Sequence, residues 1–291
     1  MRRASPRDFP ALRALCVASE GVEDYVIGYL EWEVANNYVH VALDPAGRSV
    51  GMAVYRQCID GSGWLAMART HPDFRRRGVN RAIVDSFVRL ALRKGAHVLR
   101  LWTNVGNEDG VATFRRIGFE EVARFTRIWA PPTSAPLRGD VAAFSPALWR
   151  RIRTSPLVRA GGGLVPHGWE FVRADCATVR AIAATGAMRS WDRNILAIPD
   201  LPRPTEEDAV LQLTMLAGSP GDLLEEGRRI AAAKAQPGVG VYVPHSHTLL
   251  DTANRGGFRV VDWGDEAILC ELAVPPRSRP TGSARAGTTR P

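Results

Sequence analysis

The spacing of apolar residues along the first 130 positions predicts an alternation of helices and strands. In residues 6–36 apolar side chains recur every three or four positions with a break near Gly21, which indicates one or two helices. The runs YVHVALD, SVGMAVYRQC and GWLAMART, separated by the turn segments PAGR and DGSG, predict three antiparallel strands. A helix over NRAIVDSFVRLALRKGA, a strand HVLRLWT, a helix over residues 108–117 and a last strand EEVARFTRIWA follow.

The rest of the chain repeats part of this plan. Residues 131–166 are rich in Pro and Gly around one amphipathic piece, SPALWRRIRTSPLV, and are predicted to be a linker between a domain at 1–130 and a second at 167–274. The segments that lead to Gly118-Phe119 and to Gly257-Phe258 share a plan of strand, polar loop, helix and strand, at an offset of 257 − 118 = 139 residues. We interpret this as a tandem duplication. The alternative is that Gly-Phe recurs by chance where helices meet strands.

The predicted fold class is therefore mixed α/β, with a mostly antiparallel sheet flanked by helices in each of two tandem halves. Residues 275–291, the tail, are expected to be disordered.

The composition favours an anionic binding partner but does not identify which one. The net charge of +8 and pI near 9.9 suit an anionic partner, which could be a nucleic acid, a lipid surface or a phosphorylated cofactor, or they reflect an arginine-rich coding bias. No nucleic-acid-binding motif is present. The four cysteines are scattered, which favours free thiols over zinc or disulfides, so no metal is expected. No apolar run approaches 18 residues and no secretory leader is seen, so we expect no membrane partner and a cytoplasmic location.

The stretch RTHPDFRRRGVNRA places three arginines between a predicted strand and a predicted helix. Gly78 lets the backbone turn closely around a ligand, and the amides of Val79, Asn80 and Arg81 begin the helix without intrahelical partners. With the guanidinium groups, these amides would form a site for a phosphate. The alternative is a solvated run of charge.

This stretch resembles the pyrophosphate loop of the GNAT superfamily of acyl-CoA-dependent N-acyltransferases, Arg/Gln-x-x-Gly-x-Gly/Ala. Arg75, Gly78 and Asn80 stand at its three defined positions. Asn80 replaces the small residue of the motif, and we expect it to cap the helix. The stretch NEDGVATFRRIGF is similar to a later motif of the family, with Asn107, Phe114 seven residues on, and then Gly-Phe.

The resemblance implies a GNAT fold with acetyl-CoA as the cofactor. The residues that it implies for cofactor binding are Ala68, Thr70, Arg75, Arg76, Arg77, Gly78, Val79, Asn80, Arg81, Asn107 and Phe114. In the second half the corresponding turn reads LQLTMLAGSPGDLLEEG, where Asp222, Glu225 and Glu226 would repel a pyrophosphate. The second half is therefore expected to be a degenerate GNAT-like copy that shapes the acceptor site. The first half alone is expected to bind one acetyl-CoA.

The usual proton carriers of the family are missing. By resemblance, the base would be a glutamate at Ala66 and the acid a tyrosine at Phe114. If no other group replaces them, kcat/KM should follow the titration of the acceptor amine. Alternative bases are Asp24, Glu31, Glu33, His71, His245 and His247, with Glu33 and His71 as the first candidates. The simpler interpretation is that these carboxylates are only solvated and that His71 shapes a turn.

The segment EDYVIGYLEWE is the predicted acceptor-binding surface. Asp24, Tyr25 and Trp32 would form an acidic, aromatic rim that attracts a cationic amine, unless the aromatic residues are core. The predicted function is N-acetyl transfer from coenzyme A to a primary amine of a small molecule, by a monomer or homodimer. The alternatives are acetylation of protein lysines or N-termini, and a non-catalytic acyl-CoA sensor.

Overall fold

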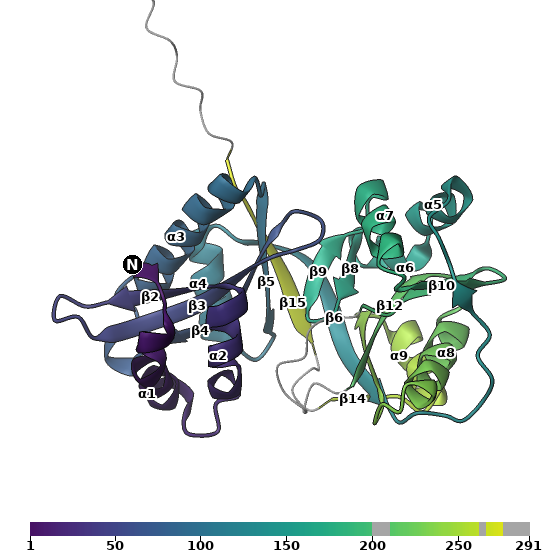
Figure 1. Cartoon of the computed structure of the whole chain (residues 1–291), viewed down its shortest axis with the longest axis horizontal. Helices are drawn as coiled ribbons and strands as arrows, with labels where there is room; N and C mark the ends of the chain where they lie inside the picture. Colours follow the sequence, from purple (N-terminus) through teal and green to yellow (C-terminus); the bar gives the residue numbers. More distant parts are fainter. Residues whose placement is uncertain (200–209, 262–265, 276–291) are drawn as a thin grey trace, which may run out of the picture.

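The computed structural model describes residues 1–199, 210–261 and 266–275 and has a mixed α/β fold (Figure 1). In the first half, residues 1–130, the predicted order of helices and strands is confirmed, and Gly21 ends the first helix. The elements are β1 (Arg2–Arg3), η1 (Pro6–Asp8), α1 (Phe9–Glu20), α2 (Val26–Asn36), β2 (Tyr38–Leu43), β3 (Ser49–Gln57), β4 (Gly63–Thr70), η2 (Pro72–Phe74), α3 (Val79–Lys94), β5 (Val98–Asn104), α4 (Glu108–Ile117) and β6 (Glu120–Ala130).

The second half follows after a short connection and begins at β7. Its elements are β7 (Asp140–Val141), α5 (Pro146–Arg153), α6 (Pro156–Ala160), β8 (Leu164–His167), β9 (Glu170–Arg173), α7 (Cys176–Ala184), β10 (Met188–Trp191), β11 (Asn194–Ala197), β12 (Leu211–Ala217), α8 (Pro220–Ala233), β13 (Val239–Pro244), α9 (His247–Arg255), β14 (Arg259–Val260) and β15 (Ala267–Ala273).

The segment 131–166 is more structured than the predicted linker. It contains β7, α5, α6 and most of β8, and Leu148, Ile152 and Val158 belong to a buried core. Pro146 and Pro156 each occupy the first turn of a helix, where the missing amide hydrogen bond costs nothing. The segment is therefore not an unstructured connection, because its two prolines begin helices. The predicted tail lies outside the described residues except for residue 275.

All described strands except β8 and β9 form one continuous sheet across both halves. Its order is β1-β2-β3-β4-β5-β15-β6-β13-β12-β11-β10-β7, with β14 paired to β6, and β8 and β9 form a separate hairpin. Neighbouring strands are antiparallel except for β4 with β5 and β12 with β13. The predicted mostly antiparallel sheet is confirmed.

The structure supports the internal repeat at the level of single hydrogen bonds. The amide of Phe119 donates to Phe114 and that of Phe258 donates to Ala253, each over 3.0 Å, so the two helix ends close in the same way 139 residues apart (258 − 119). Gly118 and Gly257 both have positive φ, of 112° and 77°. The short strands β1 and β7 also correspond, because each lies at one end of the strand order and pairs antiparallel with its neighbour, β2 or β10.

The two halves exchange their last strands. β15 lies between β5 and β6 of the first half, pairing from Ala267 with Asn104 to Ala273 with Val98 (Figure 1, yellow). In return, β6 leaves the first half and pairs with β13 from Phe125 to Ala130. Each half therefore completes its sheet with a strand from the other.

Because of this exchange, residues 1–130 do not complete their own sheet. Leu269 of β15 is completely buried in the core that joins the two halves, while Ile268 and Cys270 enter the core under α3 and α4. Without β15, the facing edges of β5 and β6 lose their hydrogen-bond partners. Helices α1 and α2 pack on the opposite side of β2 and β3 from α3.

None of the helices that the structure describes is both long and apolar enough to cross a membrane.

The strand exchange predicts that the first half does not fold alone. A fragment of residues 1–130 should lack cooperative thermal unfolding, because it lacks the strand between β5 and β6. Adding a second fragment that carries residues 131–275 should restore it. Circular dichroism melts of each fragment and of the mixture measure this, and a cooperative melt of fragment 1–130 alone would contradict it.

A single substitution in the full chain should show that the two halves unfold together. Leu269→Ala should lower the free energy of unfolding by about 2–5 kcal/mol, as expected for a buried leucine, and should leave one cooperative transition. Ala273→Ser, at the exposed end of the same strand, is the matched control. Two separate transitions in urea would show that the halves unfold independently.

Candidate functional site

The strands β4 and β5 separate in the middle of the sheet. Among the described residues, their ladder consists of the pairs Gly63 with Leu99 and Trp64 with Arg100, although both strands continue beyond it. Met67 has φ of 56°, and the register with β3 shifts close to this point, which marks a bulge. Ala68 is exposed although its strand is central. The two strands therefore present unpaired edges to a ligand.

The arginine loop follows directly at the end of β4. Arg76 and Gly78 have φ of 61° and 79°, so the backbone is left-handed on both sides of Arg77. The first intrahelical bond of α3 runs from the Ala82 amide to the Gly78 carbonyl over 3.0 Å, which leaves the preceding amides of the helix available. A Cβ at Gly78 would meet no heavy atom of the described chain within 4 Å. The loop therefore has room for an anion.

The loop arginines are held in different ways. The guanidinium of Arg75 donates to the Ser19 carbonyl over 3.1 Å at the end of α1. Arg77 stacks on the ring of Phe74 with 5.3 Å from Cζ to the ring centroid. All three arginines of the run are exposed. Their charge surrounds the loop, while Arg75 also braces it against α1.

Asn80 does not cap α3. Gly78 is the residue before the first turn, and the Asn80 side chain accepts a hydrogen bond from Thr70 Oγ1 over 2.8 Å. The expectation of an Asn80 cap is therefore wrong, because the side chain is occupied by β4. This bond ties the end of β4 to the start of α3 on either side of the loop.

Asn107 immediately precedes α4 and Phe114 lies on it, as the later motif predicts. Asn107 caps the helix by accepting from the Gly110 amide over 3.1 Å, and it donates to Thr103 Oγ1 over 2.9 Å. Phe114 is partly buried and packs edge to face with Phe119 at 5.8 Å between centroids. Neither Phe114 nor Ala66 can transfer a proton.

The acidic rim predicted on the segment before β2 is largely neutralised. Asp24 is buried and forms a bidentate ion pair with Arg69 of β4 at 2.6 and 2.7 Å. Tyr25 is 58% exposed, with the Arg69 guanidinium 5.4 Å from its ring centroid, and Trp32 is partly buried. Asp24 therefore fixes α2 to β4, and Tyr25 is the exposed part of this surface.

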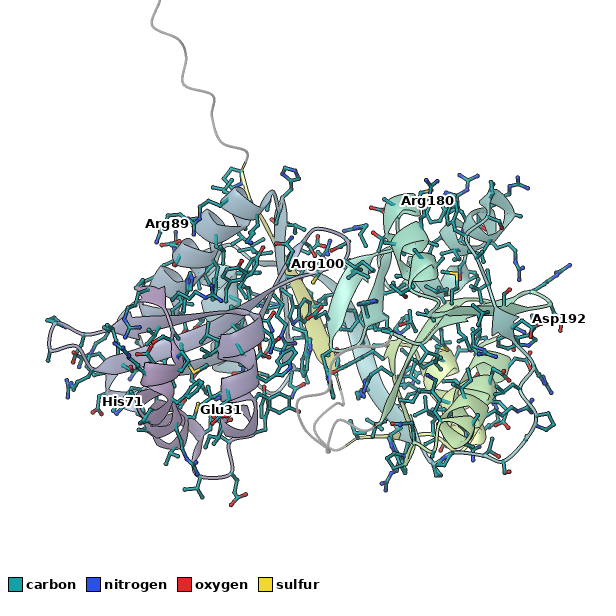
Figure 2. All side chains as sticks on the ribbon, in the orientation of Figure 1. Glu31, His71, Arg89, Arg100, Arg180 and Asp192 are labelled. Atoms are coloured by element: carbon teal, nitrogen blue, oxygen red, sulfur yellow. The ribbon has the colours of Figure 1, made fainter. Side chains whose placement is uncertain are left out.

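The first candidates for the base lie in different environments. Glu33 is fully buried, forms an ion pair with Arg56, and accepts from the Asn37 side chain over 2.9 Å. The ring Nδ1 of His71 accepts from the Asp73 amide over 3.3 Å and so shapes the turn before the loop. In Figure 2, His71 lies on the side of the first half that faces away from the second half.

The other candidates are not brought together. Glu31 is exposed on α2. His245 contacts Thr126 Oγ1 through Nδ1 over 2.8 Å and lies 4.0 Å from Glu266, whereas His247 is exposed at the start of α9. No group of three or more potential metal ligands occurs in the described parts of the chain.

The second half contributes residues that the sequence did not indicate. The hairpin β8–β9 covers the first half near the point where β4 and β5 separate, with Phe171 stacked on Trp64 at 6.0 Å. Glu170 of β9 lies 3.5 Å from Arg56 Nη1. Neither Phe171 nor Glu170 belongs to a recognisable sequence motif. The internal repeat was the sequence signal that the second half lies beside the site.

An aromatic wall continues from this hairpin. The rings of Trp102 and Trp169 lie 6.0 and 6.3 Å from that of Tyr242, and Arg127 lies 4.5 Å from the Trp169 ring centroid and 4.8 Å from that of Tyr242. Burial raises the pKa of the Tyr242 phenol above its usual range. Trp102 belongs to β5 just beyond its last pair with β4. The wall therefore borders the region where the strands separate.

A buried ion-pair network holds the hairpin in place. Arg100 bonds Glu271 of β15 over 2.6 Å and Ser62 over 2.7 Å, and it also pairs with Asp60. Asp60 in turn accepts from the Arg173 amide of β9 over 2.8 Å. Figure 2 shows Arg100 between the two halves. The pKa of Asp60 is lowered by these bonds and charges despite its burial.

The equivalent place in the second half is closed. The parallel ladder of β12 and β13 also ends early, at Leu213 with Val241, but Thr214 Oγ1 then bonds the Pro166 carbonyl of β8 over 2.6 Å. Pro220 removes one amide from the first turn of α8. Glu226 is buried and accepts from the amides of 138 and 139 over 2.8 and 3.0 Å.

The family model that matches this chain lies within the first half. Residues 7–119 match the model of the Acetyltransferase (GNAT) family. A mycothiol acetyltransferase of Mycobacterium sp. is 34% identical over 97 residues, which is 33% of this chain and 31% of that protein. The chain aligns with less than a third of the length of the curated relatives that it matches.

Two solved structures share the whole fold. A GCN5-related N-acetyltransferase from Sphaerobacter thermophilus has a TM-score of 0.56 at 13% identity, covering 94% of this chain and 95% of that one. A tandem GNAT protein from the clavulanic acid biosynthesis pathway has a TM-score of 0.52 at 13% identity, covering 94% and 96%. At such identities the likeness concerns the fold, and it confirms the tandem GNAT architecture.

The loop geometry predicts unequal effects of substitutions on coenzyme A binding. Gly78→Val should weaken binding by at least about 100-fold, because a β-branched residue disfavours the left-handed conformation and its side chain would fill the open space. Arg76→Ala should weaken it only several-fold. Calorimetry measures both affinities, and melting temperatures verify folding. An unchanged affinity of Gly78→Val for coenzyme A would show that the loop is only a solvated run of charge.

Proposed function

We propose that this chain, whose residues 7–119 belong to the GNAT acetyltransferase family, transfers an acetyl group from acetyl-CoA to the primary amine of a small molecule. One observation carries the proposal: the separated strands β4 and β5 end beside a left-handed, arginine-rich loop that opens a helix. When bound, acetyl-CoA supplies an acyl thioester with a thiol leaving group. We also propose a cytoplasmic location.

The residues of the loop fit the cofactor. The available amides at the start of α3 would hold the pyrophosphate, and the open space at Gly78 permits close approach. The exposed charges of Arg76 and Arg77 would complement the phosphates. The unpaired edge of β4 near Ala68 would receive the amide-bearing arm of the cofactor.

The hairpin β8–β9 supports a small acceptor. Phe171 stacks on Trp64, and Arg100 joins the hairpin to the sheet, so the face that carries Ala66 is covered by the second half. An enclosed site suits a small molecule better than a protein segment, which needs an open groove. The exposed ring of Tyr25 and the net negative charge of Glu33, Arg56 and Glu170 would attract an ammonium group.

A non-catalytic acyl-CoA sensor is the second candidate, favoured by the absence of proton carriers at Ala66 and Phe114. Positioning an amine beside a thioester supplies much of the rate, so activity does not require both carriers. A panel of small primary amines with acetyl-CoA, followed by detection of the released thiol, separates the two functions. We expect turnover of at least one amine. Binding of acetyl-CoA without turnover of any amine would favour the sensor.

The chain should bind one acetyl-CoA. The first half has an open loop, whereas in the second half Pro220 and the bond between Thr214 and Pro166 occupy the equivalent place. Isothermal titration calorimetry on the full chain should give a stoichiometry of one. Two binding events per chain would show that the second half retains a cofactor site.

A further inference from the structure

Two carboxylates from different halves share one guanidinium. Arg56 of β3 forms an ion pair with Glu33 of α2, and its Nη1 lies 3.5 Å from Oε1 of Glu170 on β9. With both acids ionised, this cluster carries a net charge of minus one. It therefore has the charge that complements one ammonium group.

The two carboxylates differ in access and in bonding. The side chain of Glu33 is 0% exposed, and both of its oxygens are engaged by Arg56 and Asn37. That of Glu170 is 16% exposed, and its second oxygen has only the weak thiol donor of Cys58 at 3.6 Å. Glu170 is thus the member of the pair that a ligand can reach.

The cluster lies on the same face of the sheet as Ala66, the position at which the usual base is absent. Arg56 lies directly opposite Trp64 in the β3–β4 ladder, and Trp64 forms the last pair before β4 and β5 separate. Ala66 follows two residues later, and its side chain belongs to the same hydrophobic cluster as those of Trp64 and Cys58. Glu170 therefore reaches, from the second half, the sheet face on which Ala66 carries no acid.

We propose that Glu170 is the general base that deprotonates the acceptor amine. The inference rests on the proposed function. The acceptor arrives as an ammonium ion, and one N–H proton passes to the Glu170 carboxylate, which becomes a neutral acid. The freed nitrogen lone pair forms the bond to the acyl carbon as the carbon–sulfur bond breaks. The second nitrogen proton leaves to solvent, and solvent protonates the thiolate.

The surroundings of Glu170 suit this role. Burial raises the pKa of Glu170, and the nearby charge of Glu33 adds to the rise, while Arg56 and the Cys58 thiol oppose it. In the ladder of the hairpin, the backbone of Glu170 lies opposite that of His167. Burial lowers the pKa of the His167 imidazole. Glu33 acts as a positioning residue, because it holds Arg56 beside Glu170.

The first test is kinetic. Glu170→Gln keeps the size of the side chain and one acceptor oxygen but removes the base. It should lower kcat/KM at pH 7 by about 100-fold or more, and the deficit should shrink as the free amine becomes abundant at high pH. The affinity for acetyl-CoA should not change. Glu225→Gln, at a surface ion pair of α8, is the matched control and should behave as the wild type.

The second test does not depend on activity. A raised pKa means that the folded state holds the Glu170 proton more tightly than the unfolded state does. The wild type should therefore lose stability relative to Glu170→Gln as pH rises from about 4.3 through the raised pKa. Urea unfolding of both proteins at several pH values measures this difference. A wild type that gains relative stability over this interval would show a carboxylate that only serves Arg56.

The outcomes separate this inference from the proposed function. If the wild type turns over an amine and Glu170→Gln retains kcat/KM within about threefold with the same pH profile, Glu170 is not the base, but the transferase stands. If the wild type binds acetyl-CoA and turns over no amine, the proposed function fails, and the base assignment fails with it. Glu170→Asp, which keeps the acid but shortens its reach, should recover part of the lost rate.

Discussion

The exchange of β6 and β15 is the constraint on which the rest of the structure depends. A strand between two others must satisfy hydrogen bonds on both edges, and β15 does so between β5 and β6. β6 in turn bridges from β15 to β13 and β14. Along the strand order the backbone ladders thus cross the boundary between the repeats three times, at β5 with β15, β15 with β6, and β6 with β13. Since an unpaired central edge is costly, we expect the two halves to unfold as one cooperative unit.

This constraint also places the second half over the face of the first half that carries Trp64 and Ala66. Glu271 sits on the exchanged strand and bonds Arg100, which is buried between the halves and also bonds Ser62. Arg173 of the hairpin reaches Glu271 as well, at 3.2 Å. The strand that completes the sheet therefore carries the acid that orients the hairpin. Breaking this network would leave a buried guanidinium without partners, which is strongly unfavourable.

The two copies have diverged in a way that this arrangement permits. The first copy keeps an open loop at Gly78, whereas in the second copy the hairpin bonds β12 through Thr214, where the strands would otherwise separate. The same hairpin carries Glu170 toward Arg56 of the first copy. One hairpin thus contacts β12 in the second copy and Arg56 in the first.

The sequence predicted the elements of the first half because apolar periodicity and Gly-ended helices are local signals, and α4 and β6 have the predicted bounds. The sequence could not predict the exchange of β6 and β15, because the sequence of a strand does not determine which other strand it pairs with. Pro146 and Pro156 suggested a linker when they begin helices. Asp24 and Glu33 were predicted to serve the acceptor, but Arg69 and Arg56, distant in sequence, pair with them.

The same reasoning explains how Ala66 and Glu170 fit together. A glutamate at position 66 would bring a third carboxylate to a face where Glu33 and Glu170 already share Arg56. An added like charge on this face would disfavour ionisation of the acids already there. Alanine at this position leaves the guanidinium to two acids, one enclosed and one accessible. The absence of the usual glutamate at position 66 is therefore compatible with a carboxylate that comes from the other half of the chain.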